Sequence, residues 1–453
     1  MKSRHTMDLT TGPVTGKLLR FIFPILVSNI LQHLYNAADK AVVGRFAGKI
    51  ALAAVGSTGS ATTLLLNMLV GVTIGASIIN SNLLGEQNYS GLRRSMHTSI
   101  SLGAVCGIAF SIFGLIVCEP LLRLMNCPET VLDGACLYMR IYFCGVPASM
   151  LYNFGAGILR THGDSRRPMV ILAITGAVNV CLNLVFVIVC HMTVEGVALA
   201  TIIAQYLSAA VVLYILFNPK GEFKLSFREL CLPKKEVLAI LRVGIPCGIN
   251  NMMFSISNVT IQSSVNSFGD TILAGNVAAD GYTGFLYQSL AAYYLACVTF
   301  SGQCYGARRY DRIDKLLLYS CGLSAGTIIV AAIASTLFPE VLLSMFNTDP
   351  EVIKAGMPKL LITSWAYTLY AISEALIGCL RGMRKTTIPT AINIFSICGI
   401  RILWVMFIFP LNSQSVYLLY SCYPVSYFFA ISLLGIYYLH VRRKQKREAL
   451  AAG

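Results

Sequence analysis

The sequence has little charge: Asp, Glu, Lys and Arg make up 12% of its 453 residues, about half of the share usual in soluble domains. So few charged side chains cannot cover the polar surfaces of two or three soluble domains, which excludes an ordinary soluble protein of this length. Intrinsic disorder is excluded as well, because it requires low hydrophobicity and high charge, whereas 56% of these residues are hydrophobic. The composition therefore predicts a polytopic membrane protein.

The sequence also lacks the cysteine and histidine patterns of metal sites and disulfide frameworks. Its 15 cysteines include no CxxC pair and lie mostly in apolar runs, which favours small packing residues over cross-links. A structural disulfide would have Cys118, Cys127 and Cys190, near the predicted outer loops, as its candidates. The six histidines are widely spread, so they do not form the convergent cluster that a membrane-embedded enzyme needs. We expect no cofactor and no enzymatic activity.

Long apolar runs are what the sequence has in abundance. Because about 20 apolar residues cross the hydrocarbon core of a bilayer, these runs predict twelve transmembrane helices. They cover residues 18–43, 51–80, 96–118, 135–158, 169–190, 194–217, 237–264, 272–301, 317–343, 357–380, 389–410 and 414–440. The first run lacks an A-x-A-like cleavage site after a short apolar core, so we interpret it as a retained span.

The basic residues are concentrated on one side of the predicted membrane. If the N-terminus is cytoplasmic, 27 of the 35 Lys and Arg residues lie in the two tails and in every second loop. The positive-inside rule then places both termini in the cytoplasm, and the net charge of +15 reflects topology and not nucleic-acid binding. The other eight are Lys40, Arg45, Lys49, Arg123, Arg140, Lys354, Lys359 and Arg401. Of these, Arg401 and Lys40 are the candidates for basic residues inside the membrane.

The two halves of the sequence repeat each other at an offset of 221–222 residues. A Leu-Arg pair followed by a proline occurs twice in each half, beginning at Leu19, Leu159, Leu241 and Leu380. One constant offset with six spans per half predicts two six-helix lobes related by a pseudo-twofold axis along the membrane normal, which is a transporter architecture. We expect an N-terminal lobe at 1–220, a cytoplasmic linker at 221–236 and a C-terminal lobe at 237–453 with a basic tail.

Polar side chains within the spans gather on two helix faces. In the first span, residues three or four positions apart share one face, and the seventh span repeats the pattern. These stripes, which we expect to line polar cavities, are Asn29, Gln32, Asn36 and Asp39, and then Asn251, Ser255, Asn258 and Gln262. Asp39 is the strongest candidate for ion coupling, because a charge inside a membrane is costly and marks a functional site. The alternative is a solvated carboxylate near the outer interface, beside Lys40 and Arg45.

Two acids in the second half, Glu374 and Asp280, are weaker candidates. Glu374 stands two helical turns before Arg381 on the same face, which equally fits a structural or snorkelling acid near the inner end. For Asp280, a functional and a structural role are left open. The aromatic residues of this half, among them Tyr287 and Tyr370, can stack on planar cations, although packing is their commoner role.

Several motifs resemble the multidrug and toxic compound extrusion (MATE) family. In the first half they are Leu34-Tyr35-Asn36-Ala37-Ala38-Asp39, Val43-Gly44-Arg45-Phe46-Ala47-Gly48, Ala51-Leu52-Ala53-Ala54-Val55-Gly56 and Leu159-Arg160 with Gly163-Asp164 and Pro168. In the second half they are Leu273-Ala274-Gly275-Asn276-Val277-Ala278-Ala279 and Leu380-Arg381-Gly382 with Pro389. The resemblance extends from about Gly12 to the last span, and the order of the motifs together with the repeat makes it specific.

The resemblance implies a cation site in the first lobe. Asp39, Asn179 and Thr201 match the family's pattern for that site, with Asp39 at the position of the coupling carboxylate. Asn183 departs from it, because it stands where a second carboxylate is usual. One carboxylate weakens Na⁺ binding but suffices for a proton, which favours H⁺ slightly. The alternative for Asn179 and Asn183 is ordinary hydrogen bonding between helices. In the second lobe, Tyr370 stands where one branch of the family has an acid.

We therefore expect a monomeric antiporter of the cytoplasmic membrane that expels amphipathic, cationic compounds against H⁺ or Na⁺ by alternating access. No metal is expected beyond a Na⁺ ion at Asp39, and no nucleic acid is expected as a partner. The alternative within the same superfamily is a flippase of lipid-linked precursors. Such flippases usually carry more than twelve spans and a strongly basic cavity, which this sequence does not predict. A membrane-embedded enzyme is the less favoured alternative.

Overall fold

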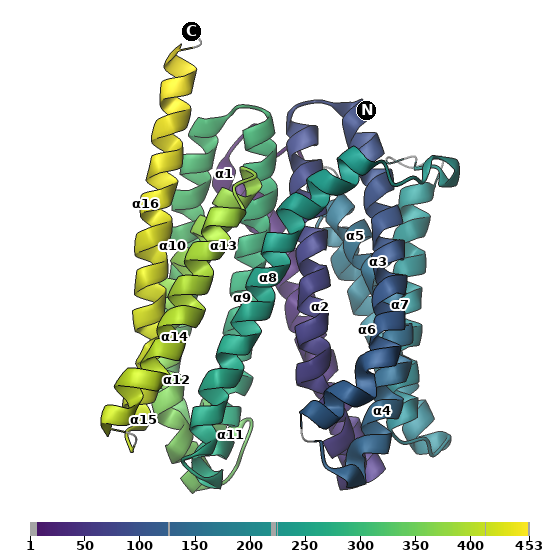
Figure 1. The fold of residues 1–453 in the computed structure, drawn as a ribbon, viewed down its shortest axis with the longest axis vertical. Coiled ribbons are helices and arrows are strands. Elements are labelled where there is room, and N and C mark those ends of the chain that lie inside the picture. Colours follow the sequence, from purple (N-terminus) through teal and green to yellow (C-terminus); the bar gives the residue numbers. More distant parts are fainter. Residues whose placement is uncertain (1–6, 126, 219–222, 224, 413, 452–453) are drawn as a thin grey trace. The chain divides into compact units, whose positions relative to one another are not determined.

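The computed structural model describes residues 7–125, 127–218, 223, 225–412 and 414–451, which form helices, turns and loops and no strands (Figure 1). The chain groups into two compact units. The first comprises Arg20–Gly248 and the described residues before Thr10, and the second comprises Thr10–Leu19 and Ile249–Gly453. The lobe boundaries predicted from the sequence, at residues 220 and 237, stay predictions.

The first unit holds most of α1 (Val14–Val42), the π-helical turn η1 (Val43–Ala47), α2 (Gly48–Gly85), α3 (Tyr89–Leu124), α4 (Glu129–Cys144), α5 (Val146–Thr161), α6 (Arg166–Leu184), the π-helical turn η2 (Val185–Val189), α7 (Val194–Phe217) and the short 3-10 turn η3 (Phe227–Glu229). Helix α8 (Lys234–Asn266) begins in the first unit and ends in the second.

The second unit continues with α9 (Asp270–Gly306), α10 (Tyr310–Leu337), α11 (Pro339–Ser344), α12 (Pro350–Gly382), α13 (Thr387–Asn393), η4 (Ile394–Gly399), α14 (Ile400–Leu403), η5 (Trp404–Ile408), η6 (Phe409–Asn412), α15 (Val416–Tyr420) and α16 (Cys422–Ala451). Elements α13 to η6 follow one another without a loop, with π-helical turns at η4 and η5. Helix α16 packs on α12 and on this segment (Figure 1).

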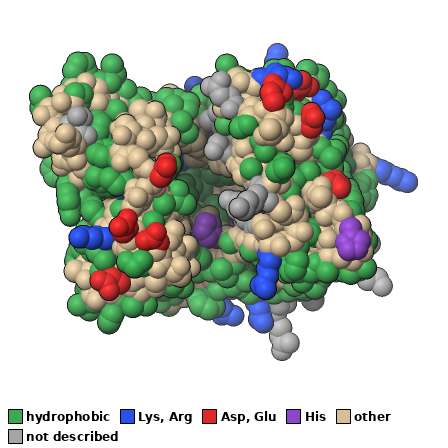
Figure 2. Space-filling view, turned by 90° about the horizontal axis from the view of Figure 1, so that it is seen from below, with side chains coloured by type: hydrophobic (Ala, Val, Ile, Leu, Met, Phe, Trp, Pro, Cys, Tyr) green, Lys and Arg blue, Asp and Glu red, His purple; other side chains and the backbone are tan. Residues whose placement is uncertain are grey.

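Ten helical segments of the described chain are long and apolar enough to cross a membrane. They are Val14–Ala47, Leu65–Gly85, Tyr89–Leu124, Arg166–Val189, Val194–Phe217, Lys234–Asn266, Tyr310–Leu337, Pro350–Gly382, Thr387–Asn412 and Val416–Arg447. Each corresponds to one of the twelve predicted spans. On the face seen in Figure 2, charged side chains are scattered among hydrophobic ones, as the low charge content requires.

The two remaining predicted spans, at 135–158 and 272–301, are not among these ten segments. The span predicted at 135–158 is divided at Gly145 into α4 and α5 of 16 residues each, and Pro147 in the first turn of α5 lacks the N–H that would continue the helical hydrogen bonds. The span predicted at 272–301 falls in α9, a 37-residue helix that carries Asn276 and Asp280. All 15 cysteines are free, Cys118, Cys127 and Cys190 among them.

Candidate functional site

The four residues predicted to couple ions meet in the first unit. Asp39 lies in the last turn of α1, Asn179 and Asn183 lie one turn apart on α6, and Thr201 lies on α7. Nδ2 of Asn183 donates to Asp39 Oδ1 at 2.5 Å and to Asn179 Oδ1 at 3.3 Å. Nδ2 of Asn179 donates to the Thr201 hydroxyl at 3.4 Å. One hydrogen-bonded network therefore joins three helices around a single carboxylate.

The side-chain amide of Asn179 is better satisfied with its oxygen and nitrogen exchanged, an assignment that hydrogen bonding decides. In that orientation the nitrogen donates to Asp39 Oδ1 at 2.9 Å, and the oxygen accepts from the Thr201 backbone N–H at 3.3 Å. These contacts take the place of the Asn179 bonds to Asn183 and to the Thr201 hydroxyl. Both asparagines of α6 then donate to the same carboxylate oxygen. Such bonds hold the Asp39 carboxylate in a fixed position beside α6.

The network contains one unmet acceptor. Asn183 is fully buried and Asn179 is 6% exposed, yet Oδ1 of Asn183 has no hydrogen-bond partner. A buried carbonyl oxygen without a donor costs about 1–3 kcal/mol. A cation bound beside Asp39, or a proton on its carboxylate, is the kind of group that would satisfy this oxygen. The carboxylate, amide and hydroxyl oxygens of this site are the ligands that hard cations prefer.

A close helix contact positions Asp39. The ring of Tyr35, one turn before Asp39, packs on Gly176 of α6, and its hydroxyl donates to the Ala173 carbonyl at 3.1 Å. A Cβ at Gly176 would lie 1.8 Å from Cε2 of Tyr35. The absence of a side chain at Gly176 therefore makes room for the Tyr35 ring on α6, one turn from the Asp39–Asn183 hydrogen bond.

We expect Gly176→Ala to displace Tyr35 and move Asp39 away from α6. Overpacking of this kind costs about 1–3 kcal/mol, so the melting temperature in detergent should fall. Gly435→Ala is a matched control, because a Cβ at Gly435 meets nothing within 4 Å. Equal melting temperatures for the two variants would contradict this view of the α1–α6 contact.

The other residues of the first polar stripe differ in their exposure. Gln32 and Asn36 are exposed, and Asn29 is half-buried one helical turn after Pro24. Their predicted cavity-lining role stays a prediction. Of the two basic residues expected inside the membrane, Arg401 is fully buried, whereas the side chain of Lys40 lies outside the described part of the structure.

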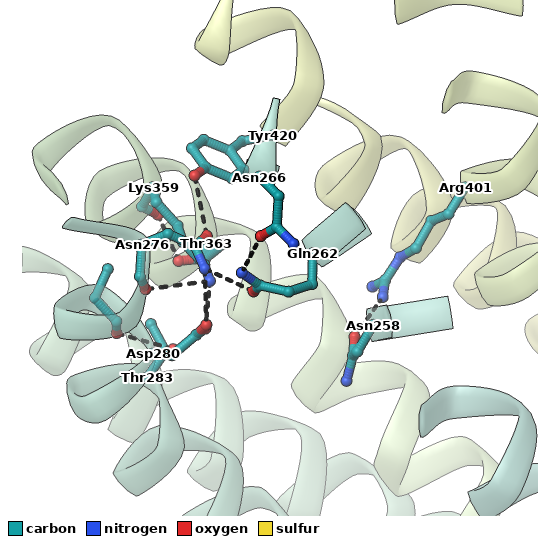
Figure 3. Close-up of polar contacts among 11 residues, drawn as sticks. Asn258, Gln262, Asn266, Asn276, Asp280, Thr283, Lys359, Thr363, Arg401 and Tyr420 are labelled. Carbon is teal, nitrogen blue, oxygen red and sulfur yellow. Dashed lines mark hydrogen bonds and ion pairs between the residues drawn. The ribbon is translucent and has the colours of Figure 1, made fainter. Parts of the chain in front are cut away.

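A second polar network lies in the second unit (Figure 3). Lys359 on α12 is 4% exposed and forms an ion pair with Asp280 on α9. Asn276 donates from Nδ2 to Gln262 Oε1 at 2.9 Å and to Asp280 Oδ2 at 3.3 Å. The Tyr420 hydroxyl donates to Asn276 Oδ1 at 3.0 Å. Asp280 is thus the counter-ion of a buried lysine, in a network whose residues come from α8, α9, α12 and α15.

The backbones of α9 and α12 touch beside this ion pair. A Cβ at Gly275 would lie 2.6 Å from the backbone N of Gly356, so two glycines allow the closest approach, as is common between membrane helices. Asn276 follows the first glycine directly, and Lys359 stands one turn after the second. This contact brings Lys359 into the network, although nothing in the sequence indicated that it is buried.

The remaining candidates of the second half belong to separate clusters. Gln262 joins the Lys359 network, whereas Asn258 accepts from Arg401 Nη1 at 3.4 Å (Figure 3). Ser255 donates to the Asn251 carbonyl one turn earlier at 3.2 Å. Glu374 is half-buried on α12, beside the Tyr370 hydroxyl and within electrostatic reach of Arg381. The structure therefore does not combine Glu374 and Asp280 into one acidic site.

The fold is that of known membrane transporters. The chain matches a solved structure described as the "Outward-facing conformation of a multidrug resistance MATE family transporter of the MOP superfamily", with a TM-score of 0.90 and 20% identity, covering 99% of this chain and 100% of that one. A transporter from Pyrococcus furiosus, described with a binding pocket of reverse polarity, matches with a TM-score of 0.90, 20% identity, and coverage of 98% and 99%. The predicted all-α polytopic fold is confirmed.

The chain belongs to the MatE family, whose model matches residues 24–185 and again residues 246–406. The two matches begin 222 and end 221 residues apart, which is the offset of the repeat in the sequence. "Probable multidrug resistance protein YoeA" of Bacillus subtilis is 28% identical over 424 residues, 92% of this chain and 91% of that protein. The "FAD transporter" of Shewanella oneidensis is 24% identical, with 81% of each chain covered. The chain is therefore a multi-pass membrane transporter of a multidrug efflux family and not an enzyme.

Proposed function

We propose that this protein is a cation-coupled antiporter that exports amphipathic, cationic organic compounds across the cytoplasmic membrane by alternating access. It works as a monomer without a cofactor, with both termini in the cytoplasm. The observation that carries the proposal is the single carboxylate of Asp39, hydrogen-bonded by Asn183 at 2.5 Å beside a buried acceptor that has no donor. An acid in such a place is expected to exchange a proton or hold a cation.

The composition of this site favours H⁺ over Na⁺ as the coupling ion. A Na⁺ ion must lose its water, and several oxygen ligands with more than one negative charge compensate that loss best. Here Asp39 supplies one charge, and Asn183 supplies a neutral amide. A proton needs only the carboxylate. Once bound, it removes the charge that the amide donors of α6 stabilise and leaves an O–H group that can donate to a neighbouring oxygen such as Asn183 Oδ1.

Neutralisation of Asp39 supplies the differential energy that alternating access requires. An ion shifts a conformational equilibrium only by as much as it binds one state better than the other. The bonds from Asn183 and Asn179 join α1 to α6 most strongly while Asp39 is ionised, because hydrogen bonds to a charged acceptor are about twice as strong as neutral ones. Protonation weakens this junction, and we infer that it favours the outward-facing state that releases the compound.

Transport by the purified protein in proteoliposomes tests the proposal. A fluorescent cationic dye is loaded, and its export is followed under a pure pH gradient and then under a pure Na⁺ gradient of the same size. We expect the pH gradient to drive export against the dye gradient, and the Na⁺ gradient to drive less. Failure of both gradients to move the dye beyond protein-free liposomes would refute the antiport.

A further inference from the structure

Arg401 is a buried cation without a counter-ion in the second unit. It is 0% exposed, and among the described residues acids of this unit pair with other cations, such as Asp280 with Lys359 and Asp314 with Arg442. Its Nε donates to the Ser426 hydroxyl at 3.1 Å and its Nη1 to Asn258 Oδ1 at 3.4 Å. Nη2 has no hydrogen-bond partner. A charge left uncompensated within a membrane span marks a functional site.

Aromatic rings enclose the guanidinium group. Its Cζ lies 4.5 Å from the ring centroid of Tyr423, 5.0 Å from that of Tyr427 and 5.8 Å from that of Phe254. Ring faces stabilise the positive charge by cation–π contact, but they accept no strong hydrogen bond in the plane of the group. The Tyr427 hydroxyl is also buried and lacks a hydrogen bond of acceptable geometry. The Tyr427 hydroxyl and the guanidinium of Arg401 therefore face each other beside the same ring system, with no anionic acceptor among the described contacts of either group.

The enclosed group is connected to the surface through two residues. Asn258 is exposed, and its neutral amide oxygen is a distant acceptor for Arg401. Tyr287, which is 36% exposed, stacks on Phe254 with centroids 5.7 Å apart and on Tyr370 at 6.2 Å. Tyr370 in turn stacks on Tyr427 at 4.8 Å. A continuous set of ring faces thus leads from the surface to the guanidinium.

We propose that Arg401 and Tyr427 form an anion-binding subsite that takes the carboxylate or phosphate group of a planar aromatic compound. The acidic group replaces the amide oxygen of Asn258, and the aromatic part packs against the exposed part of the Tyr287 ring. A guanidinium fork matches both anions by paired, charge-assisted hydrogen bonds. Lys359 cannot serve in this way, because Asp280 neutralises it.

The inference rests on the proposed transport function and narrows its substrate class. An exported compound that fits both the expected cationic character and this subsite carries an acidic group as well. The preferred substrates are therefore zwitterionic, with a planar aromatic body. A purely cationic compound would meet the positive charge of Arg401 in the second unit and gain nothing from it.

Equilibrium binding to the full-length protein in detergent, without any ion gradient, tests the subsite. The probes are 2-naphthoate, 2-naphthyl phosphate and the neutral 2-naphthamide, which share one ring system. We expect at least one anion to bind about tenfold more tightly than the amide, a difference typical of one charge-assisted contact. The tighter of the two anions identifies the acidic group that the subsite takes. Equal binding of all three probes, or no binding of either anion, would overturn the proposal.

Variants of Arg401 assign the preference to this residue. Arg401→Met should abolish the preference for the anion, Arg401→Lys should keep part of it because the charge remains without the fork, and Tyr427→Phe should reduce it. Tyr417→Phe is the matched control, since Tyr417 is 62% exposed and should bind as the parent does. Melting temperatures establish folding, and Arg401→Lys carries the test if Arg401→Met does not fold.

An unchanged anion preference in both Arg401 variants contradicts the proposal. Because no gradient is applied, this outcome is separate from the antiport. Anion binding through Arg401 without export would support the subsite and refute the proposed function. Export without any anion preference would support the proposed function and refute the subsite.

Discussion

Asp39→Asn is expected to abolish ion-driven export. The substitution keeps the shape and a hydrogen-bonding oxygen for Asn183, but it removes the only group in the first-unit network that gains or loses a charge. In proteoliposomes under a pH gradient, the parent should bring the dye concentration on the receiving side of the membrane well above that on the other side. Asp39→Asn should bring the ratio of the two concentrations only to about 1, because an uncoupled carrier merely equilibrates its substrate. Dye binding without a gradient should persist, since the network itself is retained.

The control for this variant is Asp133→Asn. Asp133 is an exposed acid on α4 of the same unit, so its loss should leave export as in the parent. Both variants must be checked for insertion and for an unchanged melting temperature. Ion-driven export by correctly inserted Asp39→Asn, at the parent's rate and ratio, would remove the basis of the proposed coupling.

Asn183→Asp extends this experiment. It places a second carboxylate one turn from Asn179, in contact with Asp39, and doubles the negative charge that a bound Na⁺ would meet. We expect the response to a Na⁺ gradient to increase relative to the response to a pH gradient. An unaltered ratio of the two responses would show that the missing carboxylate does not decide the ion.

Asp280→Asn is expected to have the largest effect on stability. It leaves Lys359, which is 4% exposed, without its counter-ion in a medium of low dielectric constant. Removing one partner of a fully buried pair costs about 3–5 kcal/mol. Because Asp280 is itself 51% exposed, we expect roughly 2–3 kcal/mol, just below that range. The corresponding fall in melting temperature is measurable by thermal unfolding in detergent.

Two further variants separate charge from packing in this ion pair. Adding Lys359→Met to Asp280→Asn removes the uncompensated charge and should restore part of the lost stability, since an apolar pair of similar volume often replaces a buried ion pair well. Asp311→Asn breaks the ion pair between Arg309 and Asp311, whose side chains are 50% and 61% exposed, respectively. The melting temperature should therefore change little. If Asp280→Asn melts at the same temperature as Asp311→Asn, Asp280 is not the counter-ion that stabilises Lys359.

One local signal and the family resemblance together predicted which side chains meet in the first unit, and their role in ion coupling stays a prediction. The spacing of Asn179 and Asn183 places both on one face of a helix. In the polar stripe of α1, Asp39 contacts α6, whereas Gln32 and Asn36 are exposed. The motif resemblance placed Asp39, Asn179 and Thr201 in one site. What the sequence could not supply is the contact between Tyr35 and Gly176, which depends on two helices that are far apart along the chain.

The second unit shows the limit of such local signals. Lys359 stands near the start of an apolar run, where a lysine is usually exposed. Its burial follows from the close backbone approach of Gly275 and Gly356, where a Cβ added to Gly275 would lie 2.6 Å from the Gly356 nitrogen. The aromatic rings that enclose Arg401 come from α8 and α16. Phe254 and Arg401 are more than 140 residues apart in the sequence, so helical periodicity carries no information about their contact. The break at Gly145 was missed for a similar reason, because the apolar run continues through it.

Proton release on dye binding tests the central claim most directly. Antiport requires that the exported compound and the coupling ion oppose each other's binding, and this opposition is reciprocal. A cationic dye is added to the purified protein in weakly buffered, Na⁺-free detergent solution, and the pH is followed. We predict release of up to about one proton per chain from the parent and none from Asp39→Asn. Equal release from both proteins, or none from the parent at any pH at which it binds the dye, would contradict proton coupling through Asp39.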